Sequence, residues 1–462
     1  MRCINKTHSF FMTALLVLLW TCQGCKKFVD VPTPVNQETT SEVFSNESQA
    51  GAAVRGLYNS MMSPGAYYAW QGGLSILVGI TSDEMATNFA SFSGFYTNQI
   101  LPTDGYNYSN LWTTFYSSIY DANAIISNVE ASTGIQPANK PGLEGEAKFV
   151  RALCYFYLVN LYDSVPFTTG TNYQANALLG RTAPSKIYDQ IVSDLQSADS
   201  TLGTNFTATG NRIRANKWSA TALLARVWLY RQQWSNAEAA ASAVIGSGLY
   251  SLDSMNNVFL NTSKEAILQL NYPGTNAYNF DGYLMSLATS SVPRYQLSPS
   301  LVNTFETGDG RKTHWAKATT ISSTTYYSPY KYKVVSGTTT GKQTEPTMFL
   351  RLAEQYLIRA EARAQQGKTT DAAADLNLVR QRAGLPATTA TTQTDLLTAI
   401  YKERFVELFS ELGHRWLDVK RTGQADAIYS VEKTGWTHND ILFPIPYTDI
   451  QRDVNLVQNP GY

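Results

Sequence analysis

Apolar side chains recur every three or four residues in several stretches of this chain, which is the pattern of amphipathic helices. In residues 110–130, for example, Leu111, Phe115, Ile119 and Ala122 fall on one stripe. The same periodicity predicts helices over residues 48–62, 143–162 and 184–202. No long series of strand-like segments appears, so the pattern predicts a mainly α-helical protein.

Two later blocks repeat one another. The block from Leu224 to Ala241 aligns with the block from Leu357 to Ala374 at a constant offset, so that Leu224 matches Leu357 and Ala241 matches Ala374. Each block reads as a helix, a short turn and an Ala-rich helix whose small residues allow close packing. This is the tetratricopeptide pattern, in which helix pairs bury their apolar faces by stacking on their neighbours. The earlier helical blocks can supply the other stacked pairs.

Two regions do not fit a helical array. Residues 67–116 contain 12 aromatic residues in 50 positions, and residues 272–332 contain 11 in 61, both above the chain average of 12%. These aromatic side chains alternate with Gly, Ser, Thr and Asn instead of aliphatic core residues. We therefore expect irregular loops that present rings to a ligand.

The N-terminus has the features of an export signal. Arg2 and Lys6 precede an apolar run over residues 10–20, and Gly24-Cys25 closes the segment. The run is too short to span a bilayer, which needs roughly 20 apolar residues. We expect residues 1–24 to be a lipoprotein-type signal peptide, Cys25 to be lipidated, and residues 25–40 to form an anchor and tether. A plain secretory signal with an incidental cysteine is the alternative.

Composition narrows the classes of function. The 462 residues carry 36 Lys plus Arg and 36 Asp plus Glu, and this balance argues against a nucleic-acid binder. Removal of the signal and acylation of Cys25 leave Cys154 alone in an apolar string, so no disulfide or cysteine metal cluster is expected within one mature chain. The three histidines after the signal are widely separated, so no metal site or cofactor is predicted. No glycine-rich phosphate loop is present.

The C-terminal third contains several ordered motifs, and they continue at the start and in the middle of the mature chain. The series resembles the SusD/RagB family of Bacteroidetes outer-membrane lipoproteins over nearly the whole mature chain. The segments that carry the resemblance are 25–30 (CKKFVD), 151–166 (from Arg151-Ala152 to Val165-Pro166), 350–362 (LRLAEQYLIRAEA), 376–384 (LNLVRQRAG), 403–409 (ERFVELF), 413–421 (GHRWLDVKR), 442–446 (LFPIP) and 458–462 (QNPGY).

The resemblance implies a SusD-like fold over residues 41–462, with an N-terminal part to about residue 230 and a C-terminal part from about 231. It implies a tetratricopeptide-like superhelix of helix pairs with an irregular, loop-rich ligand-binding face. It also implies a non-enzymatic lipoprotein of the outer membrane that is exposed at the cell surface. Such a protein captures a glycan and delivers it to a SusC-like TonB-dependent transporter.

An enzymatic function is the main competing class. Glu407 and His414 lie in a charge-rich block, residues 403–421, and an enzyme would use them as an acid–base pair. Asp83-Glu84 and Asp281 lie near the aromatic regions, but a glycosidase needs two carboxylates facing each other across a cleft. We favour a helix pair joined by arginine–carboxylate bonds, because arginine tolerates burial in such pairs better than lysine does.

The candidate ligand-binding residues come from the two aromatic regions. Flat rings can stack on the apolar face of a sugar, while polar side chains hydrogen-bond its hydroxyl groups. The stacking candidates are Trp70, Phe92, Tyr96, Tyr295, Trp315 and Tyr330, and the polar candidates are Asp83, Asn88, Arg294 and Lys331.

Two other functions remain open at this stage. The ligand of a RagB-type relative would be a peptide, whose groove needs exposed polar groups more than stacking faces. A repeat scaffold would bind only proteins and no soluble ligand.

Overall fold

The computed structural model describes residues 40–62, 65–206, 211–274, 278–289, 291–337 and 343–462. The chain divides into two units, Met1–Val43 and Phe44–Tyr462. The described part of the first unit is the short helix α2 (Thr40–Val43). The predicted signal peptide, Cys25 and the tether up to residue 39 lie outside the described residues. In the part that is described, no helix is long and apolar enough to cross a membrane.

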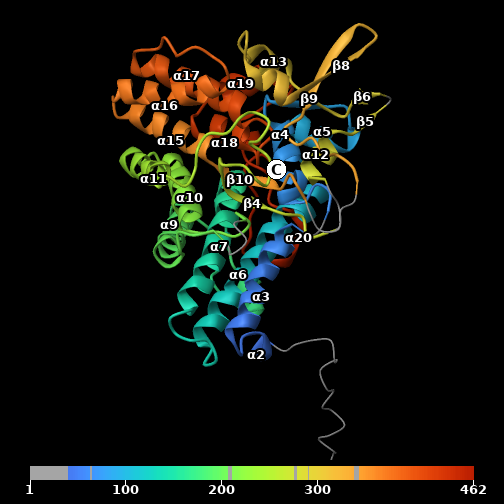
Figure 1. Ribbon diagram of the computed structural model, residues 1–462. Coiled ribbons are helices and arrows are strands. Elements are labelled where there is room, and N and C mark those ends of the chain that lie inside the picture. Colours follow the sequence, from blue (N-terminus) through green and yellow to red (C-terminus); the bar gives the residue numbers. More distant parts are fainter. Residues whose placement is uncertain (1–39, 63–64, 207–210, 275–277, 290, 338–342) are drawn as a thin grey trace, which may run out of the picture. The chain divides into compact units, whose positions relative to one another are not determined.

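The second unit is mainly helical, as the periodicity predicted (Figure 1). Its α-helices are α3 (Glu47–Met61), α4 (Val78–Thr81), α5 (Ser93–Tyr96), α6 (Thr113–Ala131), α7 (Lys140–Tyr162), α8 (Tyr173–Asn176), α9 (Pro184–Thr201), α10 (Lys217–Tyr230), α11 (Trp234–Gly246), α12 (Phe280–Met285), α13 (Pro299–Thr304), α14 (Gly310–His314), α15 (Leu352–Gln365), α16 (Thr369–Arg382), α17 (Gln393–Leu408), α18 (His414–Arg421), α19 (Ala425–Glu432) and α20 (Tyr447–Arg452). Two segments are π-helical, η2 (Ala69–Leu77) and η4 (Tyr106–Trp112), and two are 3-10 helices, η3 (Ala90–Phe92) and η5 (His438–Ile441).

Successive long helices pack on one another in the order α6, α7, α9, α10, α11, α15, α16 and α17. In Figure 1, α9, α10, α11, α15, α16 and α17 lie above one another on the left-hand side. Local sequence fixes where they begin: Asn216 and Ser219 form a reciprocal capping box at α10, and Pro184 occupies the first turn of α9. The predicted tetratricopeptide-like stacking is thereby confirmed.

The repeat is confirmed, but its register is not. Helices α10 and α11 correspond to α15 and α16 with Lys217 equivalent to Leu352 and Trp234 equivalent to Thr369. The predicted alignment, which matched Leu224 with Leu357, is therefore wrong by two positions. The turns explain the correct alignment, because Gln232 (φ 56°) and Gly367 (φ 74°) both adopt left-handed backbone at equivalent positions.

Buried small side chains repeat in this corrected register. Ala225 and Ala237 in the first pair match Ala360 and Ala372 in the second. All four are buried. Their small side chains allow neighbouring helices to approach closely. Helix α15 contributes Ile358 to the core of the first pair, so the two pairs share one interface.

Among the described residues, the strands pair two by two. They are β1 (Met85–Thr87) with β7 (Tyr295–Leu297), β2 (Val165–Pro166) with β3 (Arg181–Thr182), β4 (Ala266–Leu270) with β10 (Thr347–Arg351), β5 (Ala288–Thr289) with β6 (Val292–Pro293), and β8 (Ala316–Ile321) with β9 (Thr324–Pro329). All five pairs are antiparallel. The β1–β7 pair matters most for function, because it joins the two aromatic regions, with Thr87 opposite Tyr295.

The expectation that residues 67–116 are loops is wrong in part. Residues 69–81 form the consecutive elements η2 and α4, and every side chain in them is buried. Gly72 permits the break inside η2, with φ 92°, and its absent Cβ leaves room for Leu284 of α12. Trp70, the aromatic residue of this segment, therefore belongs to the core, not to a ligand face.

Candidate functional site

The predicted stacking residues divide into buried and accessible rings. Trp70, Phe92, Tyr295 and Trp315 are all fully buried. Trp70 packs against Phe115, Tyr157 and Phe349 at centroid distances of 5.3–5.5 Å. A ring without an exposed face has no surface on which a sugar can stack, so the structure corrects the prediction for these four residues.

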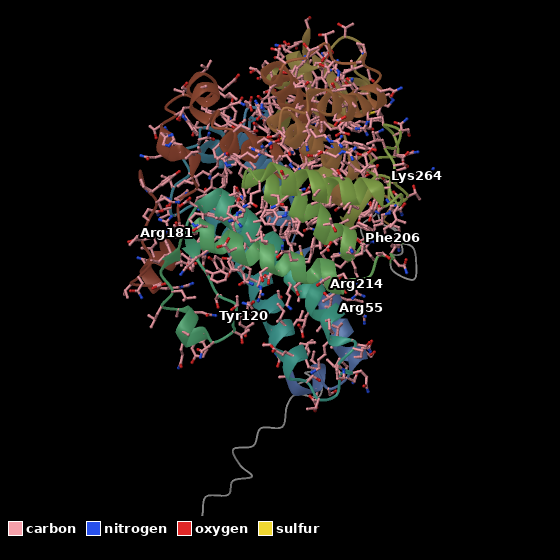
Figure 2. All side chains as sticks on the ribbon, turned by 90° about the vertical axis from the view of Figure 1, so that its left-hand side faces the viewer. Arg55, Tyr120, Arg181, Phe206, Arg214 and Lys264 are labelled. Atoms are coloured by element: carbon pink, nitrogen blue, oxygen red, sulfur yellow. The ribbon has the colours of Figure 1, made fainter. Side chains whose placement is uncertain are left out.

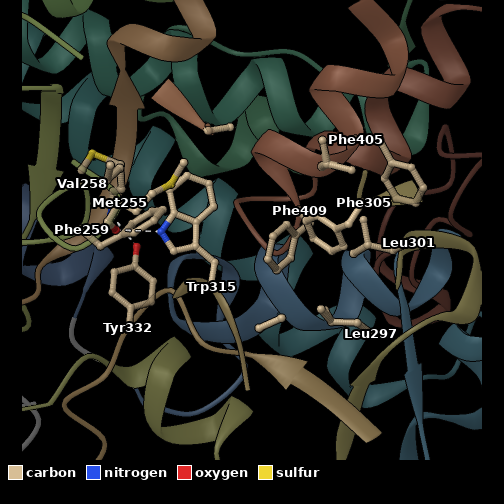
Figure 3. Packing of buried hydrophobic residues seen from close by; sticks show 14 of the residues in the cluster. Met255, Val258, Phe259, Leu297, Leu301, Phe305, Trp315, Tyr332, Phe405 and Phe409 are labelled. Atoms are coloured by element: carbon tan, nitrogen blue, oxygen red, sulfur yellow. Dashed lines mark hydrogen bonds between the residues drawn. The ribbon is translucent and has the colours of Figure 1, made fainter. Parts of the chain in front are cut away.

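Trp315 shows why such a residue is buried (Figure 3). Its indole Nε1 donates a hydrogen bond to the carbonyl oxygen of Met255 at 2.9 Å, and its ring contacts Phe259 edge-on. The side chains of Lys331 and Arg382 lie over the same ring at 4.8 and 5.2 Å. Trp315 thus separates a hydrophobic cluster from a group of buried charges, which is a structural role.

Two of the predicted polar residues are also buried in ion pairs. Asp83 receives two hydrogen bonds of 2.6 Å from the guanidinium of Arg415. Lys331 contacts Glu411 at 2.5 Å and the carbonyl oxygen of Glu407 at 2.8 Å, while burial lowers the pKa of Lys331 to about 8. Neither side chain is available to a ligand, so the structure corrects the prediction for Asp83 and Lys331.

The other two polar candidates come together at the end of the β1–β7 pair. The backbone N–H of Asn88 donates to the carbonyl oxygen of Arg294 at 3.3 Å, and the Asn88 side chain is exposed. The Arg294 guanidinium lies 4.3 Å from the ring centroid of the half-buried Phe89. We call these three residues the loop patch. Phe89 was not among the sequence candidates, although it directly follows Asn88.

The loop patch rests on a buried aromatic floor. Phe92 contacts Phe89, Tyr67 and Tyr106 at centroid distances of 4.8–5.0 Å. Beneath it, the hydroxyl groups of Tyr67 and Tyr295 are 2.7 Å apart. Two predicted stacking residues, Phe92 and Tyr295, therefore support the patch from below instead of touching a ligand.

Tyr67 carries local backbone strain beside the patch. Its φ is 67°, which is unusual for a residue with a bulky side chain. Strain of this kind persists only where the surroundings hold it, and it concentrates at functional sites. Burial lowers the pKa of Arg294, but hydrogen bonds to Tyr67 and Tyr295 outweigh it and raise that pKa, so Arg294 stays charged.

The remaining two stacking candidates are accessible, and each is accompanied by lysine. Lys433 lies over the exposed ring of Tyr96 at 4.5 Å. Lys317 and Lys333 lie 5.9 Å from the half-buried ring of Tyr330. Lys433 is buried and its Nζ donates to the carbonyl oxygen of Ile80 at 2.9 Å, so it holds one face of Tyr96 covered. The exposed part of Tyr96 and the half-buried ring of Tyr330 can still serve as contact points.

A surface hollow of about 670 Å³ lies between α13, α17, α18 and α19. Tyr401, Lys402, Phe405 and the Asp83–Arg415 pair form part of its lining. The guanidinium of Arg415 lies 3.8 Å from the centroid of Phe405. Because Arg415 is already occupied by Asp83 and Phe405, the hollow offers fewer free polar groups than its volume suggests.

The charge-rich C-terminal block forms a buried ionic network. Glu407 accepts hydrogen bonds from Arg311 at 3.0 Å, from Arg351 at 2.5 Å and from Arg382. These arginines lower the pKa of Glu407 well below its usual range, although burial alone would raise it. The predicted arginine–carboxylate bonding of the helix pair is confirmed by Arg404 of α17, which donates to Asp418 of α18 at 2.7 Å. The network consists of Glu265, Asp309, Glu403, Glu407 and Glu411 with Arg311, Lys331, Arg351, Arg380 and Arg382.

This arrangement removes the acid–base interpretation of Glu407 and His414. Both carboxylate oxygens of Glu407 are held by arginine, and burial lowers the pKa of His414 to about 4. Within the ranges that the structure describes, no group of three His, Cys, Asp or Glu side chains is placed to hold a metal ion.

Comparison with known proteins identifies the family to which this chain belongs. A family profile described as "SusD family" matches residues 316–462, and one described as "Starch-binding associating with outer membrane" matches residues 27–229. The chain belongs to the SusD/RagB family, as its motifs predicted.

Individual relatives resemble the chain over most of its length. "SusD-like protein P25" of Formosa agariphila is 26% identical, covering 96% of this chain and 98% of its own. "Starch-binding protein SusD" of Bacteroides thetaiotaomicron is 24% identical over 74% of this chain and 77% of its own. Among solved structures, a "Laminarin binding SusD-like protein" is 26% identical with a TM-score of 0.76, covering 90% of this chain and 100% of that one.

Proposed function

We propose that this protein binds a glycan at the outer surface of the cell and passes it to a SusC-like TonB-dependent transporter. The main support for this proposal is the loop patch. It combines an aromatic side chain, a charged donor and an exposed amide on two paired segments of backbone, at the place where the two aromatic regions meet.

The chemistry of the loop patch suits a sugar. The amide of Asn88 can both donate and accept hydrogen bonds, and the guanidinium of Arg294 presents several donors in one plane. The ring of Phe89 supplies apolar surface next to them. The aromatic floor holds Phe89, and Phe89 lies against Arg294, before any ligand arrives, so these two side chains lose little conformational entropy on binding.

The family supports the ligand class and the location. One matching profile is described as starch-binding and associated with the outer membrane, and one similar solved structure is named as laminarin-binding. Lipidation at Cys25 would attach the protein to that membrane, since several acyl chains together give stable anchoring. The proposal includes no catalytic step, because the carboxylates in the C-terminal block serve the ionic network.

Binding of the purified full-length chain to a panel of polysaccharides, by affinity gel electrophoresis and calorimetry, tests the proposal. We expect retardation on at least one glycan. Phe89→Ala and Arg294→Ala should each weaken that interaction about tenfold, which corresponds to about 1.4 kcal/mol. Arg231→Ala is a matched control, because Arg231 also lies over an aromatic ring, Trp228, but follows α10. Its affinity should not change.

Other outcomes would redirect the proposal. If no glycan is retarded but a peptide library binds, the ligand is a peptide. If neither binds while the transporter co-purifies, the protein acts as a scaffold. Delivery is tested separately by deleting the protein from its host: unchanged growth on the bound glycan would contradict a role in uptake.

A further inference from the structure

A second aromatic surface begins in the first aromatic region, residues 67–116, with Tyr108, Trp112 and Tyr116, and extends beyond it to Tyr120. Neighbouring hollows of about 430, 250 and 200 Å³ are lined by η4, α6, α20 and the segment 166–179. They are continuous, because Tyr116 lines all three, while Trp112, Asp449 and Arg452 each line two. We call this surface the aromatic groove. Volumes of this order suit one or more rings of a small ligand.

The floor of the groove is a row of rings at four-residue spacing: Tyr108, Trp112, Tyr116 and Tyr120. Four residues of α-helix rise about 6 Å, so the rings along α6 follow one another on a single helix face. The row lies one position from the apolar stripe of Leu111, Phe115 and Ile119, which faces the core. Figure 2 shows Tyr120 on the side of the molecule opposite Phe206 and Lys264.

Hydrogen bonds fix the rings in place. The indole Nε1 of Trp112 donates to Asp449 at 2.5 Å, and the hydroxyl of Tyr116 donates to the carbonyl oxygen of Pro166 at 2.7 Å. At one end, Arg452 donates to the hydroxyl of Tyr108 at 3.0 Å. At the other end, Tyr120 is 52% exposed. The groove therefore presents a preformed floor with one accessible ring at its edge.

The charge around the groove is low. Residues 97–129 contain no Lys, Arg or Glu, and residues 164–180 contain no charged side chain. Burial raises the pKa of both Asp121 and Asp449, which disfavours their charged forms. Asp453 is a third carboxylate in the lining. Arg452 is the cation among the described lining residues, and it lies 3.7 Å from Asp449. A neutral ligand fits such a surface better than an ion does.

The geometry points to the aromatic groove as a second binding site, for a neutral oligosaccharide, separate from the loop patch. The ligand class of this second site rests on the proposed function, but the residues of the site differ from those of the loop patch. Tyr116 and Tyr120 would contact the apolar faces of successive sugar rings. Asp449 and Arg452 would bind their hydroxyl groups.

A protein partner is the competing occupant. Tyr173, Leu178, Val454 and Val457 are exposed around the groove, and exposed apolar groups of this kind are frequent in protein interfaces. The hollows favour the oligosaccharide, because a broad protein surface resting on the rim would leave them unfilled. Binding of defined sugars separates the two occupants.

Fluorine NMR of the full-length chain, labelled with 5-fluorotryptophan, tests this proposal. The resonance of Trp112 is assigned by its loss in Trp112→Phe. The background is Phe89→Ala with Arg294→Ala, which removes the loop patch. The probes are hexasaccharides of β-1,3-, α-1,4- and β-1,4-linked glucose. We expect one of them to shift the Trp112 resonance in this background. Adding Tyr120→Ala or Arg452→Ala should weaken that binding at least tenfold, while Tyr173→Ala, on the rim, should not.

Each remaining outcome is decisive. If the unmodified chain binds a hexasaccharide but Trp112 never responds, the groove proposal fails and the loop patch stands. If Trp112 responds and the loop-patch variants bind normally, the proposed primary site fails instead. If no probe binds anywhere, both fail. If Tyr120→Ala leaves sugar binding intact but abolishes co-purification of the transporter, the groove is a protein-docking surface.

Discussion

Charged and aromatic side chains are distributed in opposite ways in two regions of this protein. In the C-terminal helices, Glu407 and three arginines are buried together and bind one another. At the loop patch, a single cation, Arg294, covers the half-buried ring of Phe89. The first region satisfies its charges internally and has nothing left for a ligand. The second keeps polar groups at the surface over a rigid floor.

Density of charge is a poor guide to function in this fold. The block with the most ionisable residues serves stability, because its members have no partners to spare. A ligand site is better sought where a side chain is held in place but still has hydrogen-bonding groups without a partner in the protein. Substitutions in the two regions test each side of this contrast.

The largest effect is expected from the centre of the ionic network. Glu407→Gln removes the negative charge that three arginines share, and leaves those cations buried without it. Breaking a buried ion pair from one side typically costs about 3–5 kcal/mol. We therefore expect the free energy of unfolding to fall by that amount, measured by urea denaturation at pH 7. A loss below about 1 kcal/mol would show that the network is not structural.

Glu84 is expected to give the next largest effect. Its Oε1 accepts a hydrogen bond from the backbone N–H of Ser410 at 3.2 Å. Its Oε2 is buried and has no hydrogen-bond partner among the residues that the structure describes. Burial raises the pKa of Glu84 from 4.5 to about 8. Glu84 is thus a buried carboxyl that lacks the arginines that hold Glu407 in its charged form.

The sign of the pH effect follows from this raised pKa. Below pH 4.5 the carboxyl is protonated in both the folded and the unfolded chain. Between pH 4.5 and 8 the unfolded chain releases the proton while the native state retains it, so stability falls as pH rises. Glu84→Gln should remove this fall, which is on the order of 2–4 kcal/mol. Urea denaturation of both proteins at pH 5 and at pH 8 measures the change in the free energy of unfolding between these two pH values. An equal change in the unmodified chain and in Glu84→Gln would contradict the prediction.

At acid pH, the stability of the fold changes with pH in the opposite direction. Burial alone would raise the pKa of Glu354, but Arg226 lowers it to about 2. Its contribution to stability is present above pH 4.5 and is lost as pH falls toward 2. Glu84→Gln should leave this acid limb unchanged, which provides an internal control for the preceding experiment.

Sequence patterns predicted much of this architecture. The four periodic stretches became α3, α6, α7 and α9, because amphipathic spacing reflects one buried face. The arginine–carboxylate bonding of α17 and α18 was also foreseen from composition. The register of the repeat was not, because the sequence alignment has more identical residues than the structural alignment, which is shifted by two positions. The helix starts and the turns at Gln232 and Gly367 identify the structural alignment.

Individual site residues were harder to predict. Trp315 stands among polar neighbours in sequence, yet it is buried because Phe259, from a distant segment, packs on it. Trp70 precedes the largely apolar stretch 74–80, and the distant Phe349 packs on its ring. Burial by residues far away in the chain leaves no trace in local composition. Asn88 and Arg294 were selected as separate candidates, and only the β1–β7 pairing brings them together.

A smaller effect is expected when the loop patch itself is changed. Phe89 is half-buried and lies above Phe92, whose ring is fully buried. Phe89→Ala should lower the free energy of unfolding by only about 1 kcal/mol, because the floor below remains packed. Thermal unfolding of the variant and of the unmodified chain measures this change. A loss above about 3 kcal/mol would place Phe89 in the core and remove it from the proposed ligand site.

The smallest effect should come from an exposed ion pair between the two helical repeats. Lys368 contacts Glu238 at 2.6 Å, but its side chain is 45% exposed, and Glu238 also contacts Arg363 at 3.0 Å. Lys368→Ala should therefore change the free energy of unfolding by less than about 0.5 kcal/mol in urea denaturation. A loss above about 1.5 kcal/mol would mean that surface charge helps to hold the repeats together. The buried contact of Ile358 with the first pair would then be insufficient to join them.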